Sequence, residues 1–105
     1  MTATTNLERG QQWLDQVLEK MSLPCRTTLD QERDWLVIDH QALTPVQLEA
    51  LLGPQGAVLD ALQFLANVTL NLGVDAEQQH PYTLELRGHR AQRLVELQTL
   101  AETAV

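Results

Sequence analysis

The fold of this chain is decided by residues 51–62, LLGPQGAVLDAL, in which Gly53 and Gly56 separate two apolar segments. Leucines recur at helical spacing on both sides of this pair, which predicts two helices joined by a very short turn. Glycine allows a sharp turn and the close approach of another backbone. The turn also presents the N-terminus of the next helix, where free N–H groups attract phosphate. The stretch therefore predicts a helix–GxxG–helix unit.

The two helices on either side of this turn have recognisable ends. Thr44 is placed to cap the upstream helix, Pro45 suits its first position, and Gln47 completes a capping box. We expect this helix to end at Gly53 and the downstream helix to be capped by Gly73. The downstream helix has an apolar stripe, which we interpret as core: Val58, Leu59, Leu62, Leu65, Ala66 and Leu70.

Further from the turn, the periodicity predicts two more helices and three strands. The stripe Leu7, Leu14, Val17, Leu18 and Met21 predicts a first helix that Asn6 caps and Pro24 ends. Residues 25–29 and 35–38 form an antiparallel hairpin around a polar turn, and 82–86 form a third strand. The final helix carries Leu94, Leu97, Leu100, Ala101 and Ala104. The order α-β-β-α-α-β-α predicts an α+β fold, with a three-stranded sheet and helices packed on one face.

This order, with GxxG between two helices, is the type II KH arrangement, and KH loops of this kind clamp about four nucleotides. Residues 36–105 resemble the KH domain of the Jag family, the SpoIIIJ-associated proteins. The family pattern LIGxxGxTLDALQYLxN is similar to Leu51-Leu52-Gly53, Gly56 and residues 59–67, LDALQFLAN. The family's later GYRERR resembles residues 88–93, GHRAQR.

The resemblance implies a bacterial, cytoplasmic protein that binds single-stranded RNA through a type II KH-like fold. It implies one KH domain over residues 1–105, with residues 1–23 as the N-terminal helix and 24–105 as the remainder. The family usually carries a second nucleic-acid domain with an arginine-and-histidine signature after the KH domain. No such signature follows here, so we expect either an excised domain or a shortened relative.

The charge of the chain works against nucleic-acid binding. Seven basic and fourteen acidic residues leave a formal net charge of −7, which repels phosphate at long range. Between Asp34 and Glu85 there is no Lys or Arg. KH loops usually have a basic residue where this one has Pro54 and Gln55; proline has no N–H, and glutamine donates hydrogen bonds without charge.

A second candidate contact for phosphate or a partner is the basic cluster Arg87, Arg90 and Arg93. Arg90 and Arg93 are three residues apart and should share a helix face. The alternative interpretation is a solvated helix start whose arginines pair with nearby acids.

Other classes of protein fit the sequence poorly. A single cysteine, Cys25, excludes an internal disulfide and favours a reducing compartment. We find no secretory signal and no apolar run of membrane-spanning length, so we expect a cytoplasmic protein. His40, His80 and His89 lack metal-ligand spacing and are expected to face solvent, and the carboxylates are scattered. We therefore expect no enzyme activity, metal or cofactor.

Two functions remain. The first is a KH module that clamps the backbone of single-stranded RNA with residues 53–56, and only weakly because of its charge. The RNA-binding residues that the resemblance implies are Gly53, Pro54, Gln55, Gly56 and Ala57. The alternative is a protein-interaction or KH–KH dimerisation module with little RNA affinity of its own. It would pair with a second copy or another KH protein, while RNA would be held by the second module or the partner.

Overall fold

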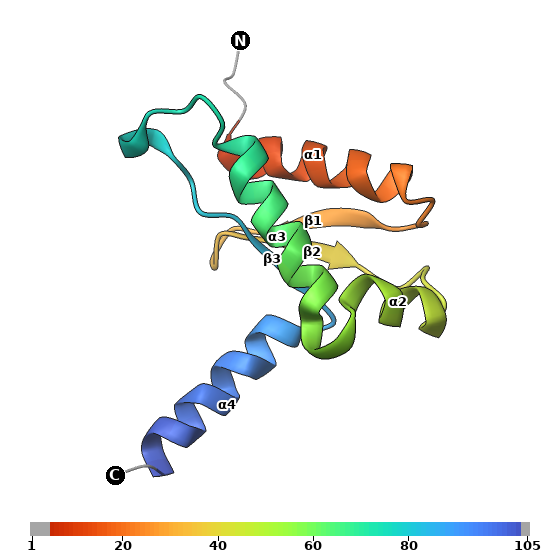
Figure 1. Ribbon diagram of the computed structural model, residues 1–105. Coiled ribbons are helices and arrows are strands. Elements are labelled where there is room, and N and C mark those ends of the chain that lie inside the picture. Colours follow the sequence, from red (N-terminus) through yellow and green to blue (C-terminus); the bar gives the residue numbers. More distant parts are fainter. Residues whose placement is uncertain (1–4, 104–105) are drawn as a thin grey trace.

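The computed structural model describes residues 5–103 of the chain (Figure 1). The helices are α1 (Asn6–Lys20), α2 (Pro45–Leu52), α3 (Ala57–Leu70) and α4 (His89–Thr103), with short 3-10 turns at Pro54–Gly56 and Ala76–Gln78. The strands are β1 (Arg26–Asp30), β2 (Trp35–Asp39) and β3 (Thr83–Leu86). The predicted α+β class and the order α-β-β-α-α-β-α are confirmed.

The sheet has the strand order β1-β2-β3. β1 and β2 form the predicted antiparallel hairpin, with Thr28 opposite Val37. β2 and β3 are parallel, with Leu36 opposite Leu84, because the two helices between them return the chain to the same end of the sheet. β2 is the central strand, as its apolar sequence on both faces predicts.

The core lies between the sheet and the helices α1 and α3, which cover one face (Figure 1). Helix α1 contributes Leu14 and Leu18, both fully buried. The fully buried side chains of the other elements are Leu36 and Ile38 on β2, Leu51 on α2, Leu59 on α3, and Leu84 and Leu86 on β3. Leu65 was expected in this core, but its side chain is about half exposed because it lies on the outer face of α3.

The outer edge of β1 is bound by side chains of α1. The Thr27 N–H donates to Asp15 Oδ1 at 2.7 Å, and Gln11 Nε2 donates to the Thr27 carbonyl at 2.8 Å. Gln11 and Asp15 are four residues apart and therefore lie on the same face of the helix. One turn of α1 thus replaces the missing neighbour strand at this position.

The outer edge of β3 is bound in the same way by α3. Asn67 donates to the Tyr82 carbonyl at 2.9 Å and accepts from the Tyr82 N–H at 2.8 Å. Gln63 Oε1 accepts from the Leu84 N–H at 3.0 Å. These groups of the edge are therefore already hydrogen-bonded within the chain.

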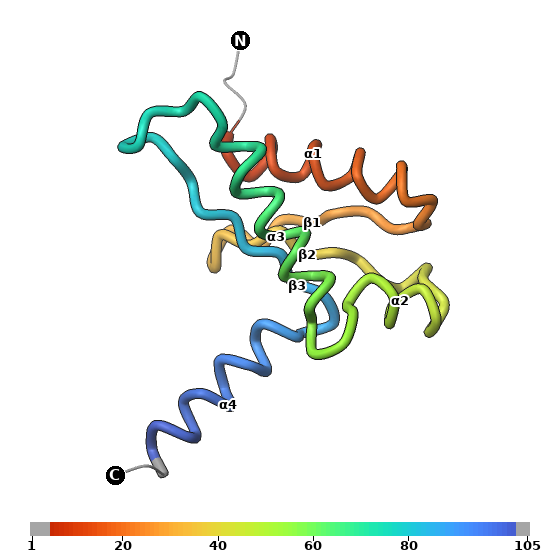
Figure 2. The backbone as a smooth tube through the Cα atoms, in the orientation of Figure 1, coloured from red at the N-terminus to blue at the C-terminus, as the bar shows by residue number. Residues whose placement is uncertain are grey.

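Helix α4 differs from the other helices, because it projects away from the body (Figures 1 and 2). Its large apolar side chains are all about half exposed or more: Leu94, Val95, Leu97 and Leu100. The expectation of helices packed on one face thus holds for α1 and α3, whereas α4 contacts the sheet mainly at β3, near its own start. Ala104, predicted in the same stripe, lies outside the described residues.

Several element ends differ from the sequence-based expectations. Thr5 rather than Asn6 caps α1, with its hydroxyl accepting the Glu8 N–H at 3.1 Å, because Asn6 is already helical. Helix α3 ends at Leu70 with Asn71 as its cap, so Gly73 lies in the following turn. The capping box of Thr44 and Gln47 is confirmed. Within residues 5–103, no helix has the length and apolar character needed to cross a membrane.

Candidate functional site

The GxxG loop is a tight turn with three residues in left-handed conformations. Gly53 and Gly56 have φ angles of 75° and 81°, and Gln55 between them has φ 56°. Gly56 is buried, whereas Pro54 and Gln55 are exposed at the tip of the loop. The loop therefore presents Pro54 and Gln55 to any ligand.

Both glycines are required by the fold itself. A Cβ on Gly53 would lie 2.7 Å from the backbone nitrogen of Val58, and one on Gly56 would lie 2.8 Å from Cε1 of His89. The two glycines were expected to allow the close approach of another backbone. Instead, the imidazole of His89 from α4 occupies the space at Gly56.

Most backbone donors of the predicted clamp are already used inside the chain. The N–H groups of Gly53 and Gly56 donate to the carbonyls of Glu49 and Gly53, at 2.8 and 3.1 Å. The Ala57 N–H donates to the Pro54 carbonyl, and proline has no N–H. These N–H groups are therefore not free for a phosphate, and a phosphate contact at this loop depends on side chains.

The fold places the first turns of α4 beside this loop. A hollow of about 550 Å³ separates them; its lining residues are Gln55, Asp60, His89, Arg90, Gln92, Arg93 and Glu96. In the sequence the loop and the basic cluster are separate candidates, because residues 57–86 lie between them. The structure joins part of the cluster to the loop, and Gln92 and Glu96 were not predicted as site residues.

The three arginines of the cluster point to different neighbours. Arg87 faces Glu49 at 3.7 Å and lines a different hollow, beside α2. Arg90 pairs with Asp60 and donates from Nε to the Leu84 carbonyl at 3.1 Å.

Arg93 pairs with Glu96 at 3.6 Å, so each arginine of the cluster has an acidic partner, as the solvated interpretation expects. Their accessibility differs: the side chain of Arg90 is 18% exposed and that of Arg93 is 64% exposed. Arg93 is thus the accessible arginine of the hollow.

The N-terminus of α4 is closed by Glu85. This carboxylate is 5% exposed and accepts the N–H groups of Leu86, Arg90 and Ala91 at 2.9, 2.7 and 2.9 Å. A negative charge in this position is favoured by the helix dipole. Glu85 therefore caps a helix instead of adding to the acidic surface around the loop, and it occupies the place that an external anion would need.

The histidines are less exposed than predicted. His40, His80 and His89 are all half-buried; His80 lies 3.0 Å from a carboxylate oxygen of Asp34, and His89 packs on Gly56. Their surroundings are set by contacts distant in the sequence, which residue spacing alone does not reveal. Among residues 5–103, no three His, Cys, Asp or Glu side chains gather as metal ligands.

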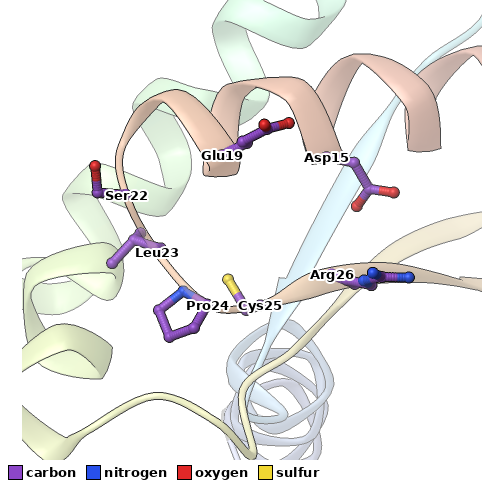
Figure 3. Close-up of a pocket in the computed structure, with 7 residues that line it drawn as sticks. All are labelled: Asp15, Glu19, Ser22, Leu23, Pro24, Cys25 and Arg26. Atoms are coloured by element: carbon purple, nitrogen blue, oxygen red, sulfur yellow. The ribbon is translucent and has the colours of Figure 1, made fainter.

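A second hollow, of about 740 Å³, lies between the end of α1 and the start of β1 (Figure 3). Its lining residues are Asp15, Glu19, Ser22, Leu23, Pro24, Cys25 and Arg26. Burial raises the pKa of the Cys25 thiol, and the negative charges of Asp15 and Asp39 raise it further. A raised pKa makes this cysteine a poor nucleophile. We therefore place the candidate site at the GxxG loop.

A scan of the chain against protein-family models gives no match, and a search of the curated proteins gives no significant match. The resemblance to the Jag family thus remains a hypothesis that rests on the residues quoted for it.

Proposed function

We propose that this chain binds single-stranded RNA at the GxxG loop, as a KH-type module. The observation that carries the proposal is the shared hollow, in which the exposed tip of the loop faces an arginine-bearing helix. Gln55 and Gln92 supply hydrogen bonds there, and Arg93 supplies an accessible positive charge. Phosphate is the group that such donors recognise. In this proposal the protein acts in the cytoplasm, catalyses no reaction and needs no cofactor.

The proposed binding is weak for an electrostatic reason. Two arginines and two acids, Asp60 and Glu96, line the hollow, so their formal charges cancel. The whole chain carries −7. Only a few phosphates can be neutralised, and each contributes one counterion-release step to the affinity. We therefore expect a low affinity that falls only modestly as salt is added.

The proposal is tested by titrating the chain with a short fluorescent single-stranded RNA at low salt. Replacing Pro54 and Gln55 with lysine should strengthen binding, because both side chains lie at the exposed tip. Gln31→Lys in the turn between β1 and β2 is the control, since it adds a positive charge far from the loop along the chain. Absence of binding even by the double lysine variant would reject the proposal.

A second candidate function is self-association, as the dimerisation alternative supposes. Its specific support is a set of apolar side chains that are about half exposed or more: Phe64, Leu65 and Val68 on α3, Leu72 just after it, and Leu94, Val95 and Leu97 on α4. At roughly 100 Å² each, these side chains would bury about 1,400 Å² in a reciprocal pair of chains, within the range of specific interfaces.

The occupant we propose for this surface is a second copy of the chain, since α3 has a single charged residue, Asp60, and α4 has as many positive as negative ones. Sedimentation velocity at increasing concentration tests it. A dimer that Leu97→Gln weakens supports self-association, and a monomer at the highest soluble concentration rejects it.

A further inference from the structure

We infer that Arg93 is the residue that holds a phosphate of the bound strand in the hollow, and that Glu96 competes with this phosphate. The inference rests on the proposed RNA binding and adds to it the contact residue and its built-in competitor. Neither role follows from the GxxG motif, because both residues lie on α4.

Arg93 is the remaining candidate, because the other candidate groups are already bound within the chain or lie outside the hollow. Three N–H groups of the loop donate within the chain, and Glu85 occupies the N-terminus of α4. Arg90 is mostly buried, bound to Asp60 and to the Leu84 carbonyl. Arg87 lines another hollow. Arg93 alone among the cluster's arginines combines high exposure with a place in the hollow beside Gln55.

The pair of Arg93 and Glu96 can open at little cost. Its atoms are 3.6 Å apart, and both side chains are more than half exposed. Such surface pairs contribute little to stability, because water screens them and holding two long side chains costs entropy. A phosphate offers arginine a bidentate, charge-assisted contact and can displace the carboxylate. Once displaced, Glu96 still lies in the hollow, where its charge repels the phosphate.

Arg90 and Asp60 have a positioning role in this scheme. Their ion pair joins the first turn of α3 to the first turn of α4 across 30 residues of sequence. It fixes the distance between the loop tip and Arg93. It also neutralises Asp60, which would otherwise repel a phosphate at the start of α3.

The test is fluorescence anisotropy of a labelled ten-nucleotide single-stranded RNA with the whole chain at several salt concentrations. Arg93→Gln should weaken binding and make the slope of log K against log salt less negative by about 0.7, the loss of one neutralised phosphate on a single strand. Glu96→Gln should tighten binding by roughly two- to fivefold. Arg87→Gln is the matched control, because it removes the same charge from a similarly exposed side chain outside this hollow.

The outcomes separate the inference from the proposal beneath it. Arg93→Gln and Arg87→Gln with equal affinities and slopes would overturn the inference, while RNA binding that responds to lysine at Pro54 and Gln55 would still stand. If Glu96→Gln leaves the affinity unchanged, Glu96 does not compete with the phosphate. If neither the unmodified chain nor the double lysine variant binds RNA, both the inference and the proposed function are overturned. Circular dichroism of each variant shows whether the fold is retained.

Discussion

Helices α1 and α4 are both 15 residues long and carry leucines at helical spacing, but only α1 buries them. Leu14 of α1 is fully buried against the sheet, whereas Leu97 of α4 is 48% exposed. The difference comes from the chain direction at each helix. The turn after β3 places Arg87 and Gly88 in left-handed conformations, and α4 then leaves the body. Apolar periodicity thus predicts a helix and its apolar face, without predicting what covers that face.

The two helices are also attached differently. Helix α1 is bound along its length by Arg9, Gln11 and Asp15, which hydrogen-bond to backbone groups of α3 and β1. Helix α4 is held at its first turns, through the Glu85 cap and the Arg90 pair. A helix attached at one end can present side chains to a ligand or a partner, and this is where we place Arg93.

The largest expected effect tests burial directly. Leu14→Ala should lower the free energy of unfolding by about 3 kcal/mol, because it removes buried methyl groups and leaves a cavity. Leu97→Ala should change it by less than about 0.5 kcal/mol, as is usual for exposed positions. Urea unfolding followed by circular dichroism measures both. Equal losses would contradict the comparison and show that α4 is covered in solution.

The next effect concerns the attachment of α4. Glu85→Gln keeps the shape of the side chain but removes the charge that caps the helix, at a cost of about 2 kcal/mol in local stability. Hydrogen exchange at the amides of Arg90 and Ala91 should become about thirtyfold faster. Glu77→Gln, in an exposed 3-10 turn, should leave these amides unchanged. Unaltered exchange in the Glu85 variant would mean that α4 is held by other contacts.

A smaller effect is expected at the edge that α1 protects. Asp15→Ala leaves the Thr27 N–H without its acceptor and should cost about 1 kcal/mol in unfolding free energy. Gln16→Ala, at an exposed position next to it, is the control. The same urea titration compares the two variants. If they unfold at the same urea concentration, the bond between α1 and β1 contributes nothing to stability.

The smallest effect is chemical. Because the pKa of Cys25 is raised by burial and by the charges of Asp15 and Asp39, less thiolate is present at a given pH. Alkylation by iodoacetamide at pH 8 should therefore be slower than for free cysteine. Asp15→Asn should speed it up by lowering that pKa. Glu19→Gln removes a charge from the same hollow but leaves Asp15 and Asp39 in place. If Glu19→Gln speeds up the alkylation of Cys25 as much as Asp15→Asn does, this explanation is wrong.

Local features of this fold were readable from the sequence because their partners lie within a few residues. The capping box joins Thr44 to Gln47, and the hairpin joins two strands separated by one short turn. The GxxG turn was also predicted, since only glycine readily takes the left-handed angles of Gly53 and Gly56. The cap of α1 was misplaced by one residue because Thr5 and Asn6 are equally suitable types.

The candidate site was predicted only in part, because its chemistry comes from contacts distant in sequence. The sequence marked Gln55 and Arg93 as two separate candidates. The pattern of residues along one chain does not reveal how close the two lie in space. Glutamate is usually a surface residue, but the fold buries Glu85 under α4. Gln92 and Glu96 gave no signal, since polar residues on an exposed helix are ordinary.

The sequence by itself determined the order of the elements, the turn at residues 53–56 and the absence of basic residues around it. Tertiary structure alone decided that α4 returns Arg90 and Arg93 to that turn, and that its leucines stay exposed. The physical reason is the range of the interactions. Helix caps and turns are determined by neighbouring residues. The charge and shape of this hollow depend instead on the direction that α4 takes after β3.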